Sequence, residues 1–279
     1  MTMAELKEAC GLLIHKPVLW IPGLAGGLCA ALLWLTYIFL GAFFAGRIIV
    51  IAGLVLLFFI TGMIALIKQN DGSVQALIGT ARRYYFRVLL PQLVVLFMIL
   101  LVFVLVMLTL TLVGITPDPA LLVFLSIGVA LPSILLTFFA DTAAVFEERK
   151  VFDAIQRSVD IVSQNMMQFI TFILVSVFVC CGILFGLMVV WEALLYDKLE
   201  PITHYTEEQL IAFTPDQLLA MIGTEGTWVT ALVLFLAGLI LIPLLVSYKT
   251  CFFKKLAGST VVIQQVTGEY DSKGRWYKY

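Results

Sequence analysis

Six long apolar stretches restrict the fold of this chain more than any other feature of its sequence. A helix that crosses a bilayer needs about 20 mostly apolar residues, because the hydrocarbon layer is about 30 Å thick and a helix rises about 1.5 Å per residue. The six stretches cover residues 18–45, 48–67, 88–114, 120–146, 166–196 and 228–248. The first is too long for a signal-peptide core and lacks a cleavage site, so we expect it to be retained. The sequence therefore predicts an all-α integral membrane protein with six transmembrane helices.

The composition supports the same class. The chain is 62% hydrophobic and only 13% charged, whereas soluble domains have about 45–50% apolar and about 25% charged residues. Water cannot be the solvent for most of such a surface. A soluble enzyme, a disordered tail and a nucleic-acid-binding domain are therefore excluded, and the lipid bilayer is the expected partner.

The positions of the basic residues predict the orientation. With six spans, all of the 17 Lys and Arg residues except Arg47 and Lys198 fall on one side. Cytoplasmic segments next to spans retain positive charge. We therefore expect a multi-pass cell-membrane protein with both termini in the cytoplasm. Residues 197–226 then form an outer loop, and residues 257–279 form a cytoplasmic C-terminal tail.

An internal repeat is the second expectation. Segments 4–14, 74–86 and 151–164 show the spacing of amphipathic helices, and each precedes a pair of spans. Aligning Ala9, Ala81 and Val159 brings them into register and gives units of about 1–70, 71–147 and 148–256. The sequence predicts three parallel repeats of a cytoplasmic amphipathic helix followed by a transmembrane hairpin, with tight outer turns at 46–47 and 116–119. In the third unit a short helix over 215–222, closed by Gly223, is expected within the outer loop.

The expected faces of the third amphipathic segment are distinct. The apolar face is predicted by residues that recur at spacings of three or four, namely Val151, Ile155, Val159, Val162 and Met166, whereas Arg157 falls on the polar face. In the second segment the expected apolar face consists of Val74, Leu77, Ile78, Ala81, Tyr85 and Val88. We expect these segments to lie along the inner membrane surface.

Two stretches resemble a known family. Residues 139–165 read FADTAAVFEERKVFDAIQRSVDIVSQN, in which a span ends in an acidic residue and a short turn leads to Ala154 and Ser158 at the start of an amphipathic helix. The opening ACGLLIHKPVLWIPGL shows a helix that leads through a proline into the first span. Both are similar to uncharacterised polytopic membrane proteins of archaea, which resemble the membrane domain of some bacterial glycerophosphodiester phosphodiesterases. The resemblance implies an architecture and no activity, because the catalytic barrel is absent.

Charged residues inside spans are costly and often functional, so Asp141 and Glu192 are the first candidate sites. Asp141 lies near the inner end of the fourth span. A structural pair with Arg149 or Arg157, a cap at the start of the third amphipathic helix, or a proton site would explain it. Glu192 lies at the outer interface, where a carboxylate is more often simply hydrated than functional. Glu147 and Glu148 precede two basic residues and indicate a solvated helix junction.

The remaining polar candidates lie on the cytoplasmic side. Arg82, Arg83 and Arg87 form a basic cluster that either binds anionic lipid or only fixes the topology. Arg157 and Ser158 are candidates because they lie in the segment that carries the resemblance.

Chemistry-bearing motifs are missing from the sequence. The five cysteines give no disulfide framework, the two histidines fall on opposite sides of the membrane, and there is no zinc-binding, nucleophile-elbow or phosphate-loop motif. We therefore expect no cofactor, no metal and no enzymatic activity. Two GxxxG pairs, Gly23 with Gly27 and Gly182 with Gly186, predict close helix packing.

Two functions remain open from the sequence. The first is a non-enzymatic scaffold or partner-binding membrane module, whose partner is another membrane protein or a second copy of the chain. The second is a transporter or lipid-handling protein with a path between the three hairpins. A polar or cavity-lining surface on facing spans would discriminate between them.

Overall fold

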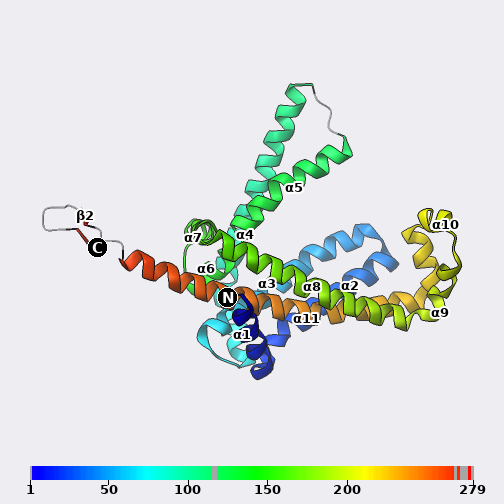
Figure 1. The fold of residues 1–279 in the computed structure, drawn as a ribbon, viewed down its shortest axis with the longest axis horizontal. Coiled ribbons are helices and arrows are strands. Elements are labelled where there is room, and N and C mark those ends of the chain that lie inside the picture. Colours follow the sequence, from blue (N-terminus) through cyan, green and yellow to red (C-terminus); the bar gives the residue numbers. More distant parts are fainter. Residues whose placement is uncertain (1, 115–117, 267–268, 271–275, 278–279) are drawn as a thin grey trace.

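The computed structural model describes residues 2–114, 118–266, 269–270 and 276–277, and these are almost entirely helical (Figure 1). The elements in chain order are α1 (Thr2–His15), the 3-10 helix η1 (Pro17–Trp20), α2 (Ile21–Leu40), α3 (Ala42–Gln69), α4 (Val74–Leu112), α5 (Pro119–Leu136), α6 (Ala140–Phe146), α7 (Val151–Gln164), α8 (Met166–Leu194), α9 (Tyr196–Leu199), the 3-10 helix η2 (Glu200–His204), α10 (Glu207–Ile211), α11 (Pro215–Val266), and the short strands β1 (Glu269–Tyr270) and β2 (Trp276–Tyr277).

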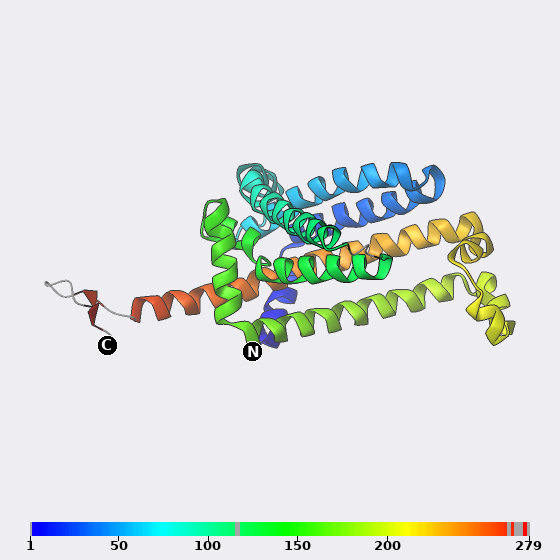
Figure 2. The ribbon, with the colours of Figure 1, turned by 90° about the horizontal axis from the view of Figure 1, so that it is seen from above.

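Six helical segments among the described residues are long and apolar enough to cross a membrane, which confirms the predicted class. Four of their helices lie roughly side by side in the order α3, α2, α11 and α8 (Figure 2). The start of the chain in α1 and the end of α11 lie toward one end of this bundle, and α9 and α10 lie at the other (Figure 1).

Helix α11 is packed closely against α2, and glycine makes the approach possible. A side-chain carbon added at Gly238 of α11 would lie 2.7 Å from the Cα atom of Gly27 in α2. The predicted packing role of Gly23 and Gly27 is therefore confirmed. The corresponding prediction for Gly182 and Gly186 is wrong, because such a carbon would meet nothing within 4 Å at either position.

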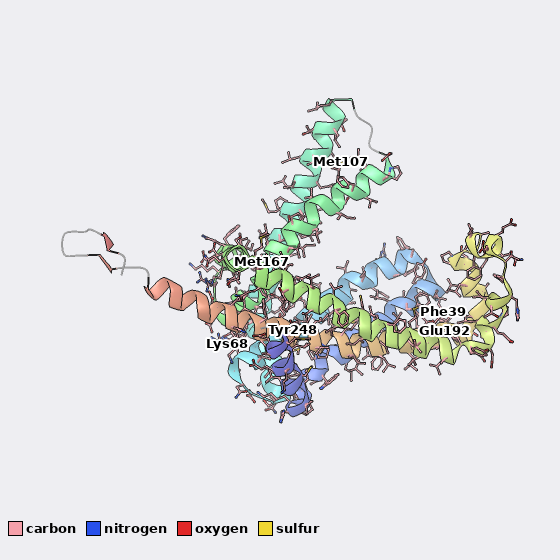
Figure 3. All side chains as sticks on the ribbon, viewed as in Figure 1. Phe39, Lys68, Met107, Met167, Glu192 and Tyr248 are labelled. Atoms are coloured by element: carbon pink, nitrogen blue, oxygen red, sulfur yellow. The ribbon has the colours of Figure 1, made fainter. Side chains whose placement is uncertain are left out.

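The α4–α5 hairpin diverges from the other spans (Figure 1), and Figure 3 places Met107 far out along it. No described residue of α5 is buried. Large apolar side chains such as Phe97 and Phe124 are exposed on this hairpin, as expected for surfaces that face lipid.

The amphipathic segments fold in part as predicted. Helix α7 has the predicted bounds, and α1 is a separate helix before the first span. The second segment is different, because residues 74–86 continue without interruption into the third span as α4. A 39-residue helix is about 58 Å long at about 1.5 Å per residue, so it extends well beyond the hydrocarbon layer. The expectation of a separate surface helix there is wrong.

The buried faces of these helices agree with the predicted ones only in part. Leu77, Ala81 and Val88 of α4 and Val162 of α7 are buried as predicted. In α7 the buried residues include Ala154, Arg157 and Ser158, whereas Val159 is only half-buried. In α4 the buried ring is Tyr84 rather than Tyr85. The sequence pattern identifies the helices. Arg157 is nevertheless buried, because it forms an ion pair with Glu147, which is described below. The threefold repeat stays a prediction.

Several helix and turn boundaries differ from the predicted ones. The first hairpin turns at Gly41, whose φ of 84° suits glycine, and residues 46–47 lie inside α3. The predicted span over 120–146 is broken between Leu136 and Ala140. The predicted turn at 116–119 lies in part outside the described residues, although Asp118 caps α5 as part of it.

The predicted outer loop and the predicted tail are more helical than expected. Residues 197–226 contain α9, η2 and α10, and α11 has a non-helical residue at Gly223, where the short helix was predicted to end. Thr214 and Gln217 form a reciprocal cap at the start of α11, since each backbone amide donates to the other's side chain. The predicted tail begins inside a helix, because α11 runs on to Val266.

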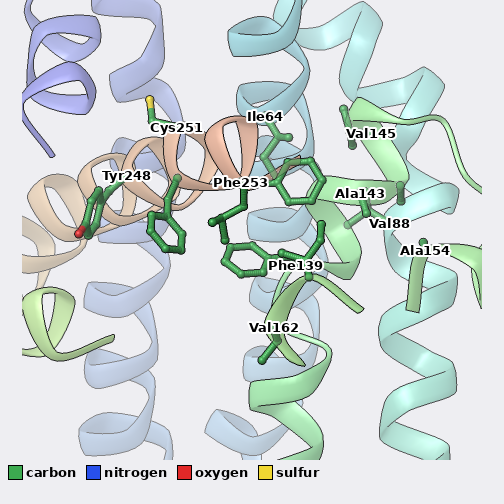
Figure 4. Packing of buried hydrophobic residues seen from close by; sticks show 14 of the residues in the cluster. Ile64, Val88, Phe139, Ala143, Val145, Ala154, Val162, Tyr248, Cys251 and Phe253 are labelled. Carbon is green, nitrogen blue, oxygen red and sulfur yellow. The ribbon is translucent and has the colours of Figure 1, made fainter. Parts of the chain in front are cut away.

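The hydrophobic core lies at the base of the bundle, where α4, α6, α7, α8 and α11 meet (Figure 4). Phe139, in the break before α6, is fully buried, and its ring centroid lies 5.7 Å from that of Phe169 and 5.8 Å from that of Phe253. The pair with Phe169 is edge-on and the pair with Phe253 is tilted, and such aromatic packing fixes orientation as well as burying area. The polar candidates surround this core.

Candidate functional site

Asp141 and Lys249 form a shielded ion pair between α6 and α11. The Lys249 Nζ atom donates to Asp141 Oδ2 at 2.7 Å, and only 9% of the Asp141 side chain and 17% of the Lys249 side chain are exposed. The other carboxylate oxygen accepts from the backbone amide and the hydroxyl of Thr142. The Lys249 ammonium also lies 4.5 Å from the centroid of the Phe138 ring.

The predicted partners of Asp141 were wrong. Arg149 and Arg157 both bind Glu147 instead, and the Arg157 Nε atom lies 3.0 Å from Glu147 Oε1. Arg157 is 4% exposed. Because a buried guanidinium needs a carboxylate, Glu147 explains why this residue faces inward from an otherwise amphipathic helix.

Glu148 joins three segments, while its side chain stays exposed, as the predicted solvated junction requires. Its carboxylate accepts from the Tyr84 hydroxyl at 2.7 Å and from Lys68 at 3.0 Å. Arg87 lies 3.8 Å from the carboxylate and also donates to the Glu148 carbonyl. The hydrogen bond from Tyr84, followed by the hydrogen bond and the charge of Lys68, lowers the Glu148 pKa from 4.5 to about 2. This carboxylate therefore ties α3 and α4 to the segment between α6 and α7.

Ser158 hydrogen-bonds the backbone groups that the break between α5 and α6 leaves without helical partners. Its Oγ atom donates to the Leu136 carbonyl at 2.8 Å and accepts from the Phe139 amide at 2.9 Å. Both backbone groups lose their helical partners at the break, and burial makes unpaired groups costly. Ala154, one turn earlier on α7, is fully buried. The Ala154 and Ser158 pattern is thus explained by the contact of α7 with this break.

A cavity of ≈330 Å³ lies beside the ion pair, between the α4–α5 hairpin and the helices α6 and α11. Its wall on α4 consists of Val95, Leu96 and Ile99, and α5 contributes Ile134. Asp141 and Lys249 line it as well. The cavity therefore combines apolar walls with one ion pair.

Two side chains that line this cavity carry N–H donors without a partner among the described residues. An ammonium group has three N–H donors, and Lys249 has a single hydrogen bond among the described residues, to Asp141. Gln92 also lines the cavity, and within the described ranges its amide has no hydrogen-bond partner. A ligand with acceptor oxygens would satisfy both side chains.

The other candidates do not join this site. Arg82 and Arg83 are exposed on α4, and Arg83 lies over the Tyr84 ring at 5.3 Å. Glu192 is exposed near the end of α8 that is remote from Met167 (Figure 3). In the described part of the chain, no group of three or more His, Cys, Asp or Glu residues could hold a metal ion.

Sequence reasoning missed Lys249, Lys68 and Tyr84. Lys68 and Lys249 were used only to predict the topology, because basic residues at span ends are common. The available signal was Asp141 itself, since a carboxylate at the inner end of a span needs a cation at the same depth. Lys249 directly follows the sixth apolar stretch and meets that requirement.

Comparison with known proteins gives a family and no function. No curated protein and no solved structure matches this chain, so the resemblance to archaeal membrane proteins stays a prediction. A family model described as a domain of unknown function, DUF7847, matches residues 2–256. The match covers the six apolar helices and every residue of the site described above, and the chain therefore belongs to the DUF7847 family.

Proposed function

We propose that this protein is a non-enzymatic membrane protein that binds a lipid in the cavity beneath the α4–α5 hairpin. The cavity carries the proposal, because it combines apolar walls with an ion pair at the level where a span ends. Its volume of ≈330 Å³ is in the range of ligand sites, about 300–1,000 Å³. An amphiphile matches both parts, since its chain contacts the walls and its headgroup reaches the charges.

The proposed setting follows from the charge distribution. Both termini are cytoplasmic in this proposal, and the support is that fifteen of 17 basic residues fall on one side of six spans. The ion pair then lies near the inner leaflet, where lipid headgroups are within reach. Exposed Arg82 and Arg83 would add attraction to anionic lipid, at about 1 kcal/mol for each basic residue near the surface.

Filling the cavity tests this function. Val95→Trp places a large ring in the cavity wall, whereas Leu100→Trp changes an exposed position of the same helix and serves as the control. Each variant is purified in mild detergent, washed, and assayed by mass spectrometry for lipid retained per protein. We expect Val95→Trp to lose bound lipid and Leu100→Trp to keep it. Equal retention by both variants would contradict the proposed site.

A second candidate is the scaffold function, with a second copy of the chain as partner. It is supported by the α4–α5 hairpin, whose large apolar residues are exposed and whose α5 has no buried residue in the described structure. A cysteine at Phe124, in a variant without the native cysteines, would be crosslinked in membranes. A product of twice the chain mass would support this candidate, and a monomer alone would oppose it.

A further inference from the structure

We propose that the cavity selects lipids whose headgroup carries an anionic oxygen, phosphate or carboxylate, which Lys249 binds in competition with Asp141. The inference rests on the proposed function and deepens it, because it specifies the ligand chemistry of the same site.

Lys249 is the group that recognises the headgroup. Its ammonium is held in place by Asp141 at 2.7 Å and by the Phe138 ring at 4.5 Å, yet it has no second hydrogen bond among the described residues. Remaining N–H donors in an apolar setting favour an acceptor with negative charge, since charge-assisted hydrogen bonds are roughly twice as strong as neutral ones. The Gln92 amide, which lines the cavity from α4, offers further donors.

The Asp141 carboxylate weakens binding of the anionic headgroup. Both of its oxygens are already occupied, one by Thr142 and the other by Lys249, so it offers nothing to an incoming headgroup. Its charge repels an anion and holds the cation that the anion needs. The two partners of this ion pair should therefore affect binding in opposite directions.

The walls distinguish a lipid from a free anion. Val95, Leu96 and Ile99 face the cavity from α4, in the most apolar part of the chain. A small hydrated ion gains no binding free energy from contact with these apolar side chains, whereas an acyl chain does. Inorganic phosphate shares the headgroup chemistry but lacks the chain, and it therefore serves as a probe that separates the two contributions.

The test measures binding of fluorescent phospholipid analogues to the full chain in detergent, comparing an anionic phosphatidylglycerol analogue with a zwitterionic phosphatidylcholine analogue. We expect the anionic lipid to bind more tightly to the unmodified protein. Lys249→Gln should weaken anionic binding by about tenfold or more, the scale of one charge-assisted hydrogen bond. Asp141→Asn should strengthen it. Lys254→Gln, an exposed change on the same helix outside the cavity lining, should leave it unchanged.

The possible results distinguish the role of the ion pair from lipid binding itself. Equal binding of the two lipids, or weaker anionic binding by both Lys249→Gln and Asp141→Asn, overturns the role of the ion pair while lipid binding stands. Absence of binding of either lipid overturns the proposed function itself. Inorganic phosphate that displaces the anionic lipid at equal concentration would identify a free anion as the ligand. If Asp141→Asn aggregates on size exclusion, Lys249→Arg decides, because it should retain the anionic preference that Lys249→Gln loses.

Discussion

Replacement of Ser158 by alanine should destabilise the protein far more than loss of one surface hydroxyl would. Ser158 is fully buried and bonds two backbone groups at the break between α5 and α6, the Leu136 carbonyl and the Phe139 amide. Each buried group left unpaired costs about 1–3 kcal/mol. The expected loss in free energy of unfolding is therefore about 2–6 kcal/mol for the two groups.

The assay is unfolding in mixed micelles by increasing SDS, followed by circular dichroism. The matched control is Ser133→Ala, because the Ser133 hydroxyl donates only to the Val129 carbonyl of its own helix turn. That bond competes with a helical hydrogen bond already present, so its removal should change stability by less than about 0.5 kcal/mol. Equal effects of the two substitutions would refute the assignment of Ser158 to the break.

Three further predictions concern other parts of the fold. Because the Glu148 pKa is lowered to about 2, the contribution of this carboxylate to stability is complete above pH 4.5 and is lost as the pH falls toward 2. Glu148→Gln should therefore flatten this part of the pH dependence of SDS unfolding. An unchanged profile would count against the Tyr84 and Lys68 contacts. Gly27→Ala should destabilise by about 1–3 kcal/mol through its clash with α11, while Gly186→Ala, in open space, should be neutral or stabilising in the same assay. In a cysteine-free background of intact cells, an impermeant thiol reagent should label a cysteine at Thr206 and spare one at Lys7, and the reverse pattern would invert the topology.

The number and approximate positions of the spans could be predicted because apolar length is a local property of the sequence. The turn at Gly41 could not, because the apolar residues after it resemble a continuing span and Arg47 is the only charge nearby. Helix α4 is continuous for a related reason. An amphipathic stretch followed by an apolar one contains no residue that ends a helix before Pro91, and Pro91 lies inside the helix.

The site could be predicted only as separate charges. Asp141 was identified as a shielded carboxylate, but its partner lies 108 residues away in the chain. Glu148 was interpreted from its immediate neighbours, whereas Tyr84 and Lys68 bind it from other helices. Local patterns give the charge and the depth of a residue, and only the tertiary arrangement of helices selects its partner.

The central place of α11 has a consequence for the synthesis of the chain. Asp141 and Glu5 both depend on cations of this last helix, Lys249 and Lys255, which follow them by 108 and 250 residues. At about 5–20 residues per second, a ribosome needs roughly 5–20 s to travel from Asp141 to Lys249. During that interval the earlier helices are already made, and their carboxylates have to remain hydrated. The bundle can therefore close only at the end of translation, and the early helices depend on the insertion machinery or on water near the membrane surface until α11 arrives.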